Sequence, residues 1–298
     1  MSGIVVLLNG ASGSGRAASA ARELARIFQA AGRPARIELA PDGEQMRVLA
    51  RQAVADGCDA LVAGGGDGTV NLVASAVAGT SVPLGVIPLG TLNHFSKDLG
   101  IPADLEEAVA VVLAGRVRQV DVSEVNGHLF LNNSSIGVYP RLVRLRERYQ
   151  RWGVSKWIAA FWAMLAVLRR HSFMSVRIIA DGQTSVLRTP FVFVGNNRYR
   201  MEGFSAGTRD SLSDGHLSLY VMNASGRPSL LWLAWQVLIG RAEQMRELES
   251  SDLLEAEIET QRGSIQVSLD GEVITERSPL AYRVRPGALS VLAPDPAV

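Results

Sequence analysis

The stretch "LVAGGGDGTVN", residues 61–71, places four glycines, an aspartate and a threonine directly behind a short apolar run. An apolar run that ends in glycines predicts a buried strand and then a loop whose backbone another group approaches closely. Strands and helices alternate on both sides of it: strands are expected in "IVVLLNG", "ARIELA" and "PLGVIPLG", and helices over residues 16–32, 44–56, 71–78 and 104–114. This order predicts parallel strands with right-handed crossovers in a layered α/β domain.

The pattern changes after residue 122. Short apolar segments follow that are joined by Gly, Asn and Asp turns, which is typical of an antiparallel sandwich or barrel: "HLFLNNSSIGV", "SFMSVRIIADGQ", "TPFVFVGNN", "HLSLYVMN", "SIQVSLDGE" and "LAYRVRP". Two apolar helical segments, 154–170 and 229–240, interrupt them. We predict an α/β domain over residues 1–122, completed by a returning strand within 286–298, and a β-rich domain over 123–285.

The composition excludes some classes of protein. A net charge of +1 over 298 residues argues against a nucleic-acid binder, and the single cysteine, Cys58, excludes an internal disulfide. The beginning "MSGIVVLL" lacks the basic region of a signal peptide. The longest apolar run, residues 157–168, is shorter than the roughly 20 residues that a membrane-spanning helix needs. We therefore expect a cytoplasmic protein.

Three glycine-rich loops each follow an expected strand of the first domain: "NGASGSGR", "GGGDGT" and "PLGTLNH". In open α/β sheets, ligands bind at the carboxyl ends of strands, where loops and helix N-termini present N–H groups to anions. A tight turn would explain any one of these loops, but the three together predict a phosphate-binding site.

Two common phosphate-binding motifs fit less well. "GASGSGRA" has Arg16 and Ala17 where a P-loop has lysine and Ser/Thr, so we reject a P-loop. "GSGRAA" matches a dinucleotide fingerprint, with Glu38 placed as the ribose-binding acid. That match is weak because it leaves "GGGDGT" unexplained.

"GGGDGTVN", "PLGTLNHFSKDLGIP" and "NGASGSG" together resemble the diacylglycerol kinase catalytic domain, a family that includes bacterial soluble lipid kinases and the sphingosine and ceramide kinases. "DSLSDGHLSLYV" and "SLDGE" resemble its C-terminal motifs, so the resemblance spans residues 4–295. It implies an α/β ATP-binding domain like those of NAD kinases and phosphofructokinases, followed by an antiparallel β-sandwich-like domain for a lipid substrate. The implied activity is an ATP- and Mg²⁺-dependent lipid kinase, acting on a diacylglycerol or sphingoid-type hydroxyl.

The resemblance also assigns residues to ATP. Asp67 beside the phosphates is unfavourable for two anions, so we expect it to face Mg²⁺ or the attacking hydroxyl. The nucleotide-binding residues that we expect lie in the three loops and at the start of the next helix: Asn9, Ser12, Gly13, Arg16, Gly65, Gly66, Asp67, Gly68, Thr69, Asn71, Thr91 and Asn93.

Asp270, in "SLDGE", matches the position that is proposed in this family as the base for the lipid hydroxyl, and Glu272 lies beside it. In sphingosine kinases the aspartate equivalent to Asp67 has been given that role. We favour Asp270 as the base and Asp67 as the organiser of phosphate and Mg²⁺, and the choice stays open. A plain Asp-Gly hairpin turn explains Asp270 equally well.

Two metal sites are implied by the same resemblance. Asp121 would help to hold the active-site Mg²⁺ through water. "SLSDG" resembles a structural metal loop, in which Asp214 would bind by its side chain and Ser211 and His216 by their carbonyls. Oxygen ligands suit Mg²⁺ or Ca²⁺, although a simple turn is an equal alternative for this loop.

The main departure from the family pattern is His94, where many members have aspartate. Its effect on the Mg²⁺ network cannot be read from the sequence. His94 is the one hint of a rival function, a lipid- or nucleotide-binding protein without turnover. The C-terminal motifs and "GTLNH" argue against the other rival, an NAD kinase-like small-molecule kinase.

Residues 141–170 carry eight basic residues against one acid, around the aromatic run "WIAAFWAMLAVL". Such a segment suits transient docking on an anionic membrane surface, and the alternative is a buried helix with a solvated basic flank. The predicted partners are thus a lipid substrate and the membrane surface, with no nucleic acid. A homodimer is left open.

Overall fold

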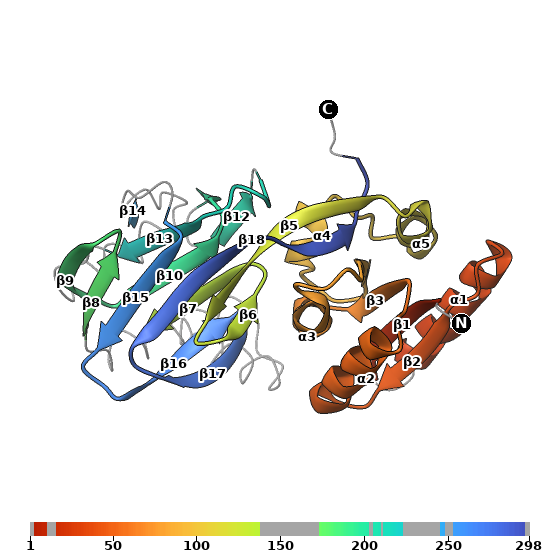
Figure 1. Cartoon of the computed structure of the whole chain (residues 1–298), viewed down its shortest axis with the longest axis horizontal. Coiled ribbons are helices and arrows are strands. Elements are labelled where there is room, and N and C mark those ends of the chain that lie inside the picture. The colour runs from red at the N-terminus through yellow and green to blue at the C-terminus, as the bar shows by residue number, and fades with distance from the viewer. Residues whose placement is uncertain are drawn as a thin grey trace, which may run out of the picture. The chain divides into compact units, whose positions relative to one another are not determined.

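The computed structural model describes residues 3–10, 16–137, 173–202, 205–209, 211–222, 245–247 and 253–295. The chain forms two compact units, Met1–Val122 with Arg285–Val298, and Ser123–Val284. Two long strands, β5 (Val117–Val125) and β18 (Leu280–Leu292), contribute residues to both units. The predicted fold class, a layered α/β domain followed by antiparallel sheets, is confirmed (Figure 1).

The first unit is built on a parallel sheet. Its strands lie in the order β2-β1-β3-β4-β18, and Val291 of β18 pairs in parallel with Leu84 of β4. The inner strands β1 (Ile4–Asn9), β3 (Ala60–Gly65) and β4 (Leu84–Pro88) are nearly continuous apolar runs, as expected for strands that are covered on both faces. The edge strand β2 (Arg36–Ala40) alternates apolar residues with Arg36 and Glu38 and is largely exposed.

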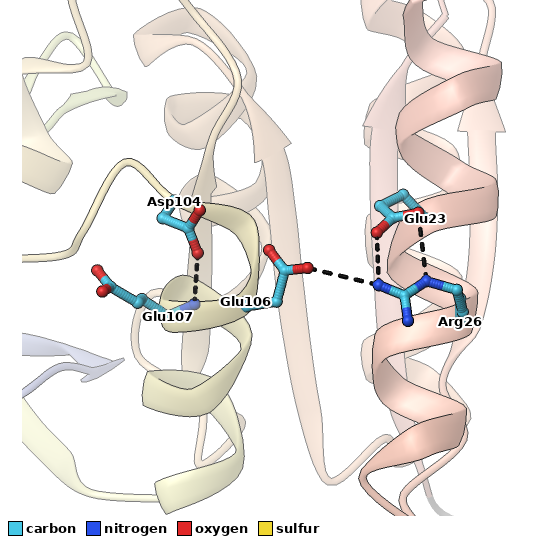
Figure 2. Close-up of polar contacts among 5 residues, drawn as sticks. All are labelled: Glu23, Arg26, Asp104, Glu106 and Glu107. Carbon is cyan, nitrogen blue, oxygen red and sulfur yellow. Dashed lines mark hydrogen bonds and ion pairs between the residues drawn. The ribbon is translucent and has the colours of Figure 1, made fainter.

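Among its described residues, the first unit contains five helices: α1 (Arg16–Ala30), α2 (Gly43–Ala55), α3 (Asp67–Val77), α4 (His94–Asp98) and α5 (Leu105–Ala114). One apolar cluster joins α1 and α5 to the sheet, and it includes Phe28, Val62 and Val109. The exposed rim of these two helices carries an ion pair of Arg26 with Glu23, at 2.7 Å, and a longer one with Glu106, at 3.4 Å (Figure 2). Exposed pairs of this kind stabilise a fold only slightly, so the apolar cluster holds the helices in place.

The described part of the second unit contains two large sheets and a third, small one. One contains β8 (Met174–Ala180), β9 (Gln183–Thr189) and β15 (Glu255–Thr260) with the first part of β18, and β6 (His128–Phe130) pairs with β5. The other has the order β14-β13-β10-β7-β16-β17 and includes β7 (Asn133–Gly137), β10 (Phe191–Asn196), β13 (Leu217–Met222), β14 (Met245–Glu247), β16 (Ser264–Leu269) and β17 (Glu272–Arg277). A third, two-stranded sheet joins β11 (Tyr199–Glu202) and β12 (Ser205–Arg209).

The core of the second unit lies between its two larger sheets. Ile178 and Ile258 come from one sheet, and Ile136, Val194 and Val267 come from the other. Residues that alternate with these point to the other face, as the two-residue period of a strand requires. This sandwich-like packing agrees with the antiparallel architecture expected from the short strands.

Some predicted boundaries differ from the structure. The helix expected at residue 71 begins at Asp67, because the glycines end with the strand and the Asp-Gly-Thr sequence already forms the first turn. "HLFLNNSSIGV" divides into β6 and β7, and the short helix α4 was not expected. The apolar segments 154–170 and 229–240 lie outside the described residues. Within the described part of the chain, no helix is long and apolar enough to cross a membrane.

A buried tyrosine makes the stability of the second unit depend on pH. The hydroxyl of Tyr282 lies 3.0 Å from the Ser134 hydroxyl, and burial raises the pKa of Tyr282 above its ordinary value. Below about pH 10 both the folded and the unfolded chain keep this proton, whereas above it only the folded chain does. Stability therefore falls as pH rises, by about 1.4 kcal/mol per pH unit from this group.

We expect Tyr282→Phe to be less stable than the wild type at pH 7, by about 1 kcal/mol, because the Ser134 hydroxyl loses its partner. Above pH 10 the variant should lose less stability than the wild type, so that the two converge. Urea unfolding at intervals from pH 7 to 11 measures this. Parallel pH profiles for the two proteins would contradict it.

Candidate active site

Loops at the carboxyl edge of the parallel sheet bring the first group of expected residues together. Strand β1 ends at Asn9, β3 at Gly65 and β4 at Pro88, and β3 pairs with both neighbours. Because parallel strands end at the same edge, the loops that follow lie side by side. Ser12 and Gly13, two of the expected ATP contacts, lie outside the described residues, as does the side chain of Arg16.

The glycines of these loops are required by packing within the protein. A Cβ added to Gly90 would lie 2.4 Å from the Cα of Gly66, so the two loops touch backbone to backbone. A Cβ on Gly64 would meet the Leu8 side chain at 2.1 Å, and one on Gly65 would meet the Thr69 hydroxyl at 2.5 Å. A larger residue at Gly90 would meet backbone that cannot move aside, and one at Gly64 or Gly65 would have to displace a neighbouring side chain, whether or not a ligand is bound nearby.

Asp67 links the two loops. It is the first residue of α3, where the positive end of the helix dipole favours a carboxylate. Its Oδ1 accepts a hydrogen bond of 3.2 Å from the backbone N–H of Phe95 in α4. The side chain is partly exposed, so one oxygen is fixed by α4 while the carboxylate still reaches solvent. This contact was missed from the sequence, where α4 was not expected.

The other expected nucleotide residues of this unit surround Asp67. Thr69 is buried, and its hydroxyl accepts a long hydrogen bond, 3.5 Å, from the Asn9 side chain. Thr91 is exposed and Asn71 is partly exposed. The backbone of Asn93 is in the left-handed region, with φ of 50°, and its side-chain amide donates to the Gly90 carbonyl at 2.9 Å. Its Oδ1 is buried and has no hydrogen-bond partner among the described residues.

Two further residues of the first unit, Asp121 and His94, differ in exposure. Asp121 lies in β5 with only 2% of its surface exposed, and its Oδ1 accepts the N–H of Gly287 at 2.8 Å. His94 is the exposed first residue of α4, one position before the N–H that holds Asp67. The departure from the expected family pattern at His94 thus lies at a surface position.

Asp270 forms the hairpin turn that joins β16 to β17. Leu269 pairs with Glu272, and Asp270 and Gly271 have φ of 47° and 92°, the signs that a type I′ turn requires. The carboxylate does more than turn the chain. Its two oxygens accept the N–H groups of Leu131 and Asn132, both at 2.8 Å, and of Asn133, at 3.0 Å.

Three N–H donors favour the ionised form of the Asp270 carboxylate. A carboxylate that is stabilised in this way is a weak base but a well-oriented acceptor. Its side chain is partly exposed. The side chain of Glu272, which follows in β17, is exposed and makes no hydrogen bond to another described residue. The hairpin alternative and the functional interpretation of Asp270 are thus compatible.

Behind Asp270 lies a buried polar network that the sequence analysis missed. Arg209, only 7% exposed, donates to the Leu131 carbonyl at 2.6 Å, the Asn196 carbonyl at 3.2 Å and the Asn132 side chain at 2.9 Å. Asn196 donates to the same Leu131 carbonyl at 2.9 Å and accepts from the Ser123 hydroxyl. The feature of the sequence that could have indicated this buried network is "LNNSS", a polar run between strand residues.

The loop at residues 211–216 is a set of tight turns. The Ser211 hydroxyl accepts the N–H of Ser213 at 3.2 Å, and the His216 ring approaches the Asp214 carbonyl at 3.4 Å. The His216 carbonyl accepts the N–H of Asn197 at 3.0 Å. Asp214 is exposed. These contacts leave the metal assignment for this loop a prediction.

The described residues fit a magnesium ion that is shared with a nucleotide. They contain no cluster of three or more His, Cys, Asp or Glu side chains that would make a complete metal site. Mg²⁺ is usually bound through one or two carboxylates, with substrate phosphates and waters as the other ligands. Asp67, which is partly exposed at a helix N-terminus, has the chemistry that this arrangement requires.

Comparison with known proteins agrees with this architecture. Residues 3–125 match the model of the diacylglycerol kinase catalytic domain, and residues 140–293 match the YegS C-terminal NAD kinase beta sandwich-like domain. A putative diacylglycerol kinase from Bacillus anthracis, known from its crystal structure, superposes with a TM-score of 0.76 at 21% identity, covering 99% of this chain and 98% of its own. That likeness shows the shared fold.

Relatives are similar over nearly their whole length. A protein from Mycobacterium tuberculosis named diacylglycerol kinase is 28% identical over 98% of this chain and 95% of its own. A probable YegS-like lipid kinase from Pseudomonas aeruginosa is 31% identical over 92% and 91%. The fold and loops define a two-domain protein of the diacylglycerol kinase type, with a YegS-type C-terminal domain. Within that type, this chain belongs to the diacylglycerol kinase catalytic-domain family of lipid kinases, as the resemblance of its motifs implied.

The contact between Gly66 and Gly90 yields a prediction about stability. We expect Gly90→Ala to destabilise the first unit by about 3 kcal/mol, because backbone atoms that cannot rotate away occupy the space of the new methyl group. Urea unfolding measures the change. Gly3→Ala is the matched control, since a Cβ there meets no atom within 4 Å. Equal stability of the two variants would refute the contact.

Proposed function

We propose that the protein is an ATP- and Mg²⁺-dependent lipid kinase that transfers the γ-phosphate of ATP to a hydroxyl of diacylglycerol or of a sphingoid-type lipid. The observation that carries the proposal is the placement of Asp67. It stands at a helix N-terminus, between two glycine loops at the carboxyl edge of a parallel sheet. Membership of the lipid kinase family and the relatives' names support the lipid as acceptor.

The geometry of the first unit supports the roles that we propose for its residues. The N-terminal N–H groups of α3 are suited to bind phosphate oxygens. Asp67 would hold Mg²⁺, which neutralises charge on the transferring phosphoryl group. The hydrogen bond from the Phe95 N–H fixes the orientation of the carboxylate, so that no reorganisation is needed when the nucleotide binds.

Asp270 would act on the lipid. In the proposed reaction the lipid oxygen forms a bond to the γ-phosphorus, the bond from that phosphorus to the bridging oxygen of ADP breaks, and the lipid proton passes to the Asp270 carboxylate. Because three N–H donors stabilise this carboxylate, it suits orientation of the hydroxyl and late acceptance of the proton. Loose transition states of phosphoryl transfer need positioning more than a strong base.

An assay with labelled ATP and a lipid panel tests the function. The panel should contain diacylglycerol, monoacylglycerol, sphingosine and phosphatidylglycerol, with NAD as a separate acceptor. We expect labelled lipid that requires Mg²⁺. Label in NAD would favour an NAD kinase-like enzyme, and ATP binding without transfer to any acceptor would favour a binding protein.

Substitution of Asp67 tests the mechanism. Asp67→Asn should lower kcat at least about 100-fold, because the amide cannot offer a charged ligand to the metal. Asp104→Asn is the matched control in the same unit: Asp104 caps α5 by accepting the Glu107 N–H at 3.1 Å, and asparagine caps equally well (Figure 2). Activity of Asp67→Asn equal to that of the control would remove Asp67 from the mechanism.

We also propose that the protein is cytoplasmic and meets the membrane transiently through residues 141–151, which carry five arginines and lie outside the described residues. Electrostatic attraction should increase sedimentation with anionic vesicles over neutral ones, and added salt should remove the difference. Equal sedimentation with both kinds of vesicle would reject this proposal.

A further inference from the structure

The short segment at residues 131–133, between β6 and β7, is held from two sides by groups of opposite charge. Its three successive N–H groups all donate to the Asp270 carboxylate. The carbonyl of Leu131 and the side-chain oxygen of Asn132 both accept from the Arg209 guanidinium. The segment thus lies between a carboxylate and a guanidinium that are 61 positions apart in the sequence.

The geometry matches the polarity of the peptide group. A peptide N–H carries partial positive charge and faces Asp270, while the Leu131 carbonyl carries partial negative charge and faces Arg209. In a poorly solvated interior each of these hydrogen bonds polarises and strengthens its neighbours. The charge of Arg209 is therefore felt at Asp270 through the peptide groups of this segment.

The surroundings of Arg209 fix its own orientation. It ends β12, its guanidinium lies 5.4 Å from the centre of the Tyr199 ring, and it also donates to the Asn196 carbonyl. Three acceptors around the planar guanidinium allow it only one orientation, and the ammonium group of lysine cannot reproduce this set of hydrogen bonds.

We propose that Arg209 is a positioning residue for Asp270: it orients the segment at residues 131–133, and the N–H groups of this segment orient the carboxylate that receives the lipid hydroxyl. The inference rests on the proposed function. Arg209 touches neither substrate nor nucleotide in this scheme, so its loss affects the chemical step and leaves ATP binding unchanged.

The test is a double-mutant cycle on lipid phosphorylation. Arg209→Lys should lower kcat by on the order of tenfold, less than the hundredfold that a 1 Å misplacement costs, with the KM for ATP unchanged. In an Asp270→Asn background the same change should have little further effect, because two residues that act through one group are not additive. An equal fold-loss in both backgrounds would overturn the proposal.

Two variants separate positioning from general damage. Arg177→Lys is the matched control, because Arg177 lies in β8 of the same unit and pairs with Glu259 at the surface. It should leave kcat unchanged. Asn132→Ala removes only one acceptor of Arg209. It should lower kcat by a smaller factor, about threefold, and should have no further effect on kcat in the Asp270→Asn background. If Arg209→Lys does not fold, Asn132→Ala takes its place in the double-mutant cycle. An equal fold-loss from Asn132→Ala with and without Asp270→Asn would then overturn the proposal.

Amide hydrogen exchange keeps this inference distinguishable from the proposed function. Exchange at Leu131, Asn132 and Asn133 should be faster in Arg209→Lys than in the wild type and in Arg177→Lys. If no lipid is phosphorylated by the wild type, the proposed function fails, and the exchange rates still decide whether Arg209 holds the segment. Unchanged rates would show that it does not.

Discussion

The first unit depends on one steric constraint: the backbone contact between Gly66 and Gly90 at the carboxyl edge of its sheet. That contact brings the loop after β3 against the loop after β4, which allows the Phe95 N–H to reach the Asp67 carboxylate. The glycines were expected to admit a nucleotide. Their more basic requirement is internal, because the space beside Gly64, Gly65 and Gly90 is already filled by the protein.

Both aspartates that are proposed to act are held by backbone N–H groups from segments distant in the sequence. Asp67 has one such donor and Asp270 has three. This difference in the number of N–H donors suits the different roles proposed for the two aspartates. A carboxylate with one fixed oxygen keeps capacity for a metal, whereas a carboxylate with three donors is confined to one orientation. Backbone groups serve this purpose well, because a main-chain N–H has no side-chain rotamer to change and is fixed by the elements on either side of it.

The sequence predicted the α/β domain, the change to antiparallel strands after residue 122 and the family, because each rests on local patterns of apolar residues and glycines. It predicted the candidate aspartates through motifs. It could not predict that Phe95 donates to Asp67, 28 positions away, or that Arg209 donates to Leu131 and Asn132, 78 and 77 positions away, because these contacts are made only in the folded chain. A buried arginine and a surface arginine look the same in a sequence, and only the tertiary structure separates Arg209 from Arg177.

Strand β18 has a consequence for biosynthesis. Its last part, from Arg285 onward, belongs to the first unit and pairs with β4, yet it is made after every residue of the second unit. Until the ribosome has released this strand, β4 is an unpaired edge of the nascent parallel sheet, which is open to wrong partners. The first unit is therefore the first to begin folding and the last to be completed.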